Sequence, residues 1–189
     1  RKTTEQGIKI HKIIGQDLPT ESKKNEAGVS GLSLLEATND AVGFEIEIIK
    51  RIKPGSGIGS SAASAAGTVW AMNKLLGNPF TTVQLVEFAM EGEKLATGVA
   101  HADNVAPALF GGCTLIRSQD PLDIVSIPTP EDLCITIIHP QIEIKTSDAR
   151  EILKTNVPLK SAIKQWANVG GLVSGFFMND YDLIGRSLQ

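Results

Sequence analysis

The sequence has little cysteine and no long apolar run, and each shortage excludes a class of protein. The two cysteines among 189 residues, Cys113 and Cys134, lie in strand-like runs without CxxC spacing. This spacing argues against a zinc or redox site and favours small buried thiols in a reducing compartment. No apolar stretch reaches the length of a membrane span, and no N-terminal segment has the pattern of a signal peptide. We therefore expect a cytoplasmic protein that does not act at a membrane.

The chain also lacks a strong charge of either sign. It carries 18 basic and 21 acidic residues, for a net charge of -3, and 42% of its residues are hydrophobic. Such a balance provides no global field to attract nucleic acid, so a polyanion would be held by local backbone dipoles or a few cations. We expect small-molecule partners and no nucleic acid, while the oligomeric state, a homodimer included, stays open.

Periodicity and capping residues predict an α+β fold. The chain begins at Arg1 without a methionine and stops at Gln189 inside a helical pattern, which we interpret as a fragment. Strands are expected over residues 7–14, 44–52, 113–117, 123–127 and 133–139. Helices are expected over residues 26–38, 60–76, 82–97 and 147–157, and again from Pro158 to the C-terminus. The prolines and polar residues at 128–132 mark the best candidate for a domain boundary.

The most informative segment is glycine-rich, PGSGIGSSAASAAG at residues 54–67, between an expected strand and an expected helix. Glycines at 55, 57 and 59 let the backbone approach a ligand closely, and the helix start near Ser60 offers free N–H groups and a positive dipole end. Both features favour a bound anion. The segment is therefore a candidate phosphate cradle.

Three other interpretations compete for this loop. A Walker-type P-loop is excluded because no lysine follows the last glycine. The dinucleotide fingerprint can be matched on Gly57, Gly59 and Ala62, but the acidic strand end expected about 20 residues later is missing. A glycine-rich turn before an alanine-rich core helix, with no ligand, stays open.

The motif PxGSGxGSSAA resembles the ATP-binding motif of the GHMP kinases. The resemblance implies that the loop binds the nucleotide phosphates and that Ser61 helps to hold Mg²⁺. The residues assigned to ATP by this resemblance are Pro54, Gly55, Ser56, Gly57, Ile58, Gly59, Ser60, Ser61 and Ala62, and Asn25 is added as a residue near the adenine.

Glu93 is expected to point inward, because it shares a helical stripe with Val86, Met90 and Thr97. From the residues alone, an inward Glu93 carboxylate is explained equally well by a buried ion pair and by a functional role. The neighbouring Glu87 and Glu91 lie on other faces and are expected to be solvated. The resemblance implies that Glu93 is the second Mg²⁺ ligand.

The segment His101-Ala-Asp-Asn104 follows on an expected loop. Taken alone, such residues are more often turn formers than catalysts. Together with the glycine-rich loop, HADNVAPxxFGG resembles the homoserine kinase branch of the family. The resemblance implies that His101 and Asn104 line an amino-acid pocket and that Asp103 is catalytic, orienting the acceptor hydroxyl.

Thr146 and Arg150 lie near the start of the helix expected after residue 146. Without other information Arg150 would be a surface arginine paired with Asp148 or Glu151. The pattern T-x-x-A-R resembles homoserine kinases, which implies that both residues bind substrate. A guanidinium fits a carboxylate in two parallel hydrogen bonds, so Arg150 would hold the α-carboxylate.

The resemblance implies a GHMP kinase two-domain fold, with a ribosomal-protein-S5-like N-terminal domain over residues 1–130. A ferredoxin-like C-terminal domain would begin at residue 131 and be cut short. The implied reaction is phosphorylation of L-homoserine by ATP, a step toward threonine. The family's first and third motifs do not appear here, so the fragment itself is not expected to be active. A mevalonate-type kinase and a non-catalytic nucleotide-binding domain are the alternatives.

Overall fold

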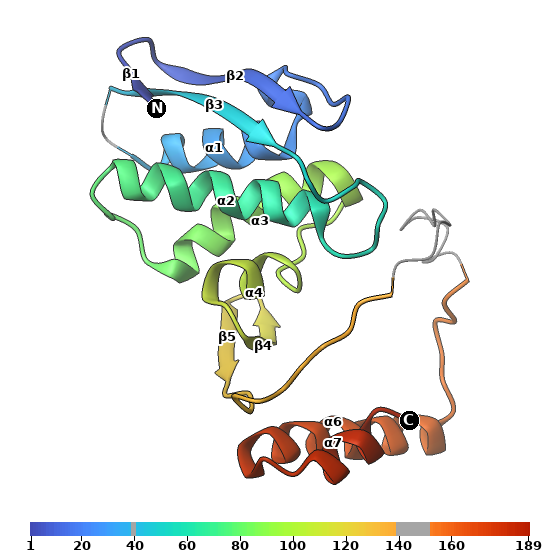
Figure 1. Cartoon of the computed structure of the whole chain (residues 1–189). Helices are drawn as coiled ribbons and strands as arrows, with labels where there is room; N and C mark the ends of the chain where they lie inside the picture. The colour runs from blue at the N-terminus through green and yellow to red at the C-terminus, as the bar shows by residue number, and fades with distance from the viewer. Residues whose placement is uncertain (39–40, 139–151) are drawn as a thin grey trace.

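A computed structural model describes residues 1–38, 41–138 and 152–189 of the chain (Figure 1). The strands are β1 (Lys2–Thr3), β2 (Gly7–Ile14), β3 (Gly43–Ile49), β4 (Cys113–Gln119) and β5 (Leu122–Ile127). The helices are η1 (Ser22–Lys24), α1 (Glu26–Glu36), α2 (Ser60–Leu75), α3 (Thr82–Thr97), α4 (Val105–Phe110), α6 (Leu159–Met178) and α7 (Tyr181–Ser187). The α+β prediction is confirmed.

A three-stranded sheet in the order β1-β3-β2 lies on a layer of helices. The strands β2 and β3 run parallel and are connected through α1, whereas β1 pairs antiparallel with the start of β3. Helices α1, α2 and α3 pack on one another beneath the sheet, and α4 packs against α2 and α3. The core that they enclose has Leu34, Phe44, Val69, Val86 and Val105 among its fully buried side chains.

Local capping explains why the main helices begin and end where predicted. The Asn25 side chain accepts a hydrogen bond from the Ala27 N–H at the start of α1. Thr81 and Gln84 form a capping box at the start of α3, which satisfies two otherwise unpaired N–H groups. Gly77 and Gly98 follow α2 and α3 with positive φ angles, as expected for residues that close helices.

The remaining segments show where local pattern was insufficient. The strand β3 ends at Ile49, three residues before the predicted end, because the chain leaves the sheet after the Lys50 N–H donates to the Ile14 carbonyl (2.8 Å). The strand predicted over residues 133–139 is wrong for 133–138, which form no strand. Similarly, residues 152–157 are not helical, so the helix predicted up to Pro158 is wrong there. The helix α4 was not predicted.

The C-terminal helices α6 and α7 pack on one another and lie apart from the sheet and helices α1 to α3 (Figure 1). No helix within the described ranges has the length and apolarity that a bilayer crossing requires.

The prediction of buried thiols is wrong, because Cys113 is half-buried and Cys134 is exposed, and both are free. Cys113 lies at the start of β4 but outside the core, and Cys134 is exposed because the strand expected around it does not form.

Candidate active site

A cavity of about 340 Å³ lies where the end of β3, the start of α2, α3 and the loop before α4 meet. It brings together residues far apart in the sequence. The lining residues are Leu18, Glu26, Lys50, Pro54, Gly55, Ser56, Gly57, Gly59, Ser60, Ser61, Glu93, His101, Asp103 and Asn104. Polar and charged groups dominate this set, which suits a charged ligand better than an apolar one.

One wall of the cavity is the loop at residues 53–59, which joins β3 to α2. Gly55, Gly57 and Gly59 have φ angles of 73°, 76° and 74°, in a region that only glycine adopts readily. Helix α2 begins at Ser60 without a side-chain cap, so its first N–H groups are not satisfied by a capping side chain. The predicted arrangement of glycines before a helix start is confirmed, and it suits an anion.

A second wall carries Glu93, a residue that is only 4% exposed. Burial raises the pKa of Glu93, and the negative charges of Glu26 and Asp103 raise it further. A hydrogen bond from Ser61 and the positive charge of Lys50 act in the opposite direction. The inward orientation predicted for Glu93 is confirmed, and so is the exposure of Glu87 and Glu91.

The residue pair Ser61 and Glu93 presents only oxygen atoms, the ligand type that Mg²⁺ prefers. The negative charges of Glu26 and Asp103 raise the cost of ionising the buried Glu93, which favours a nearby cation. Within the part of the chain that is described, no three His, Cys, Asp or Glu side chains are grouped to hold a metal. The two oxygen ligands of Ser61 and Glu93 fit Mg²⁺, which binds few protein oxygens and completes its shell with phosphate and water.

The loop at residues 101–104 forms the third side of the cavity. Its Asp103 carboxylate accepts a hydrogen bond from the Asn104 N–H (3.0 Å), and both residues are exposed. Asn104 also abuts the glycine loop, since a Cβ atom built on Gly59 would lie 3.3 Å from the Asn104 Oδ1 atom. The predicted phosphate loop and the predicted acceptor loop are thus in direct proximity.

Three residues assigned to ATP from the sequence are not brought into this cavity. Ile58 is 48% exposed and does not line the cavity, and Ala62 is buried in the core. The buried Asn25 caps α1 and also donates to the Pro19 carbonyl (2.9 Å), so its side chain is already engaged. Thr146 and Arg150 lie outside the described residues.

Sequence reasoning missed two charged residues of the cavity, Glu26 and Lys50. Glu26 stands in the first turn of α1, where an acidic residue is usually explained by the helix dipole. Lys50 comes at the end of an alternating strand, where a lysine is usually solvated. Only the position of Lys50 a few residues before the glycine-rich loop could have pointed to it.

Comparisons with known proteins point to one family. Residues 28–112 match the model of the GHMP kinases N terminal domain. A homoserine kinase of Chlorobium phaeobacteroides is 48% identical over 92% of this chain and 56% of its own length. One from Methanococcus maripaludis is 42% identical over 98% of this chain and 62% of its own length.

A crystal structure of homoserine kinase from Cytophaga hutchinsonii superposes with a TM-score of 0.94 at 51% identity. The match covers all of this chain and 61% of that protein. The chain therefore spans about three fifths of the length of these relatives. The range matched by the family model includes the glycine loop, Glu93 and the loop at 101–104, and these homoserine kinases are 42–51% identical over nearly the whole chain, so the chain belongs to the GHMP kinase family.

Proposed function

We propose that the protein containing this chain transfers the γ-phosphoryl group of ATP to the side-chain hydroxyl of L-homoserine. The observation that carries the proposal is the single cavity in which the glycine loop, the Ser61–Glu93 pair and the loop at 101–104 meet. The similarity to homoserine kinases over nearly the whole chain supports the choice of acceptor.

In the proposed reaction, a bond forms between the homoserine hydroxyl oxygen and the γ-phosphorus as the bond to the β–γ bridging oxygen breaks. The products are ADP and O-phospho-L-homoserine. The N–H groups of residues 55–61 would hold the phosphates, because a helix start and left-handed glycines present several donors to one anion. Such transfers depend mainly on positioning and on neutralising charge at the phosphates.

The acidic side of the cavity would hold Mg²⁺ through Ser61 and Glu93. When bound, the ion would neutralise negative charge between the phosphates and this protein carboxylate. The negative charges of Glu26 and Asp103 near Glu93 support this assignment, since a bound cation would offset their effect on the Glu93 carboxylate.

The acceptor side would be formed by His101, Asp103 and Asn104, joined by Thr146 and Arg150. Asp103 would orient the hydroxyl group. The proton of that hydroxyl is released to Asp103 or to water, and a strong base is not needed where the transition state is loose. Arg150 would hold the α-carboxylate by two parallel hydrogen bonds.

We further propose that residues 1–130 form an N-terminal domain of the ribosomal-protein-S5-like type and that a ferredoxin-like C-terminal domain begins at residue 131. The end of β5 at Ile127 and the separate packing of α6 on α7 support a division near this point.

The test is a coupled ADP-release assay on the full-length gene product with Mg-ATP. L-Homoserine is compared with mevalonate, galactose, L-serine and no acceptor. We expect turnover with L-homoserine far above the rest. Turnover with another alcohol would support the role assigned to the phosphate loop and contradict the assigned acceptor pocket. No turnover with any acceptor would favour a non-catalytic nucleotide-binding domain.

A further inference from the structure

The glycine loop is tied at both ends by residues outside it. Lys50, directly after β3, is 7% exposed, and its Nζ atom donates to the Ser60 carbonyl (2.5 Å) and the Ser64 hydroxyl (2.6 Å). In turn, the Ser60 hydroxyl donates to the Ile52 carbonyl (2.7 Å). These contacts join the chain before residue 53 to the first turn of α2, and so they fix the distance that the loop must span.

The position of Lys50 is unfavourable by ordinary rules. A buried ammonium loses its hydration, and this burial lowers the pKa of Lys50. A cation beside a helix N-terminus also faces the positive end of the helix dipole. The carboxylates of Glu26 and Glu93 offset part of this cost. Residues that violate local rules in this way occur preferentially at functional sites.

We propose that Lys50 is a positioning residue for the nucleotide phosphates, acting through the Ser60 carbonyl and the Ser64 hydroxyl. The inference rests on the proposed function, since it assumes that phosphates bind to the loop at 53–59. A loop with three left-handed glycines has many accessible conformations when its ends are free. Fixing both ends in advance removes ordering entropy from the binding step, so the glycine N–H groups already converge when the phosphates arrive.

The test measures steady-state kinetics of the full-length protein with Mg-ATP varied at saturating L-homoserine. For Lys50→Met we expect the KM for Mg-ATP to rise about tenfold or more. The melting temperature of the ligand-free protein should change little, because the lost contacts of Lys50 are offset by removal of the desolvation cost of its buried charge. Lys74→Met, which changes an exposed lysine at the end of α2, is the matched control and should leave the KM for Mg-ATP unchanged.

Ser64→Ala provides a second and milder variant that keeps the lysine charge. It removes one of the two acceptors of Lys50, and we expect the KM for Mg-ATP to rise roughly two- to fivefold. In the double variant Lys50→Met/Ser64→Ala, the serine change should add nothing further, because the contact is already lost.

Several results would overturn the proposal. An unchanged KM in Lys50→Met or Ser64→Ala, with an active wild type, would reject the positioning role. A lowered melting temperature with an unchanged KM would assign Lys50 a structural role alone. Independent, additive effects of the two substitutions would show that they do not act through one contact. If the wild-type protein neither turns over nor binds Mg-ATP, the proposed function fails and the role of Lys50 fails with it.

Discussion

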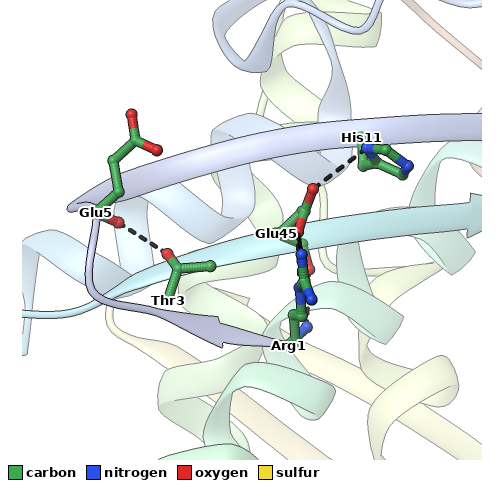
Figure 2. A network of polar contacts seen from close by, with 5 residues as sticks. All are labelled: Arg1, Thr3, Glu5, His11 and Glu45. Atoms are coloured by element: carbon green, nitrogen blue, oxygen red, sulfur yellow. Dashed lines mark hydrogen bonds and ion pairs between the residues drawn. The ribbon is translucent and has the colours of Figure 1, made fainter.

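Two charged networks are attached to the same strand, β3, and they differ in almost every physical respect. The first lies at the start of the strand on the outer face of the sheet (Figure 2). There the Glu45 carboxylate accepts a hydrogen bond from Arg1 Nε (2.7 Å) and lies 3.2 Å from His11 Nδ1. The Arg1 and His11 side chains are 79% and 60% exposed, so solvent screens both contacts.

The second network begins directly after the strand, at Lys50, and is buried. Its ammonium contacts a backbone carbonyl and a serine hydroxyl, while the nearby Glu93 is crowded by other carboxylates. Opposite charges are matched at Glu45, whereas Glu93 has an excess of negative charge around it. Arg1 lowers the pKa of Glu45, and burial raises that of Glu93. The fold thus keeps costly charges only at the end of β3 that borders the cavity.

The largest expected effect is that of Glu93→Gln on turnover. The substitution keeps the shape of the side chain but removes the charge assigned to Mg²⁺, so we expect kcat to fall by about 10²-fold or more. Glu91→Gln, an exposed acid on the same helix, is the control and should stay near wild type. Full Mg²⁺-dependent activity of the Glu93→Gln protein would contradict the assignment of Glu93 as a Mg²⁺ ligand.

The next effect concerns the backbone of the phosphate loop. Gly59→Ala places a Cβ atom at a φ of 74° and 3.3 Å from Asn104 Oδ1, and the left-handed conformation alone costs about 1–2 kcal/mol. We expect the KM for Mg-ATP to rise about tenfold, because the loop must distort. Gly67→Ala on α2 meets nothing within 4 Å and should instead stabilise the helix by about 0.5–1 kcal/mol. Equal kinetic effects of the two substitutions would contradict the loop geometry.

Both glycines illustrate how much of the site could be predicted from the sequence. The phosphate loop, the bounds of α2 and α3 and the inward orientation of Glu93 depend on local signals, namely glycines, caps and helical periodicity. These signals are read directly from neighbouring residues. The roles of Lys50 and Glu26 depend on which elements the fold brings together, and that information is not local.

The C-terminal errors have the same physical origin. The run at residues 133–138 has the β-branched residues of a strand, yet Ile135 and Ile138 are 79% and 87% exposed. A strand requires a neighbouring strand to satisfy its backbone, and the pattern of a single segment does not supply one. Helix α4 was missed for a different reason, since its six residues are too short for periodicity and include Pro107.

The pH dependence of stability should separate the two glutamates. A raised folded-state pKa means that the stabilising contribution of Glu93 is complete below the unfolded value of about 4.5 and is lost as pH rises through the folded pKa. Each unit of that elevation corresponds to about 1.4 kcal/mol. Without Mg²⁺ or nucleotide, Glu93→Gln should therefore be more stable than wild type at pH 8, with the difference vanishing near pH 4. Thermal unfolding across this range is the measurement, and a variant less stable than wild type at pH 8 would contradict the unfavourable charge.

The smallest effect is expected at the exposed network, and its sign is the opposite. Because the pKa of Glu45 is lowered, chiefly by the hydrogen bond from Arg1, its contribution is present above the unfolded value of about 4.5 and is lost as pH falls through the folded value. Glu45→Gln should therefore be slightly less stable than wild type at pH 7, and equal to it in strong acid. At 1 M salt, where the Debye length is about 3 Å, the difference at pH 7 should largely disappear. Thermal unfolding at low and high salt tests this, and a large, salt-independent loss would mean that the exposed network contributes as much to the fold as the buried one.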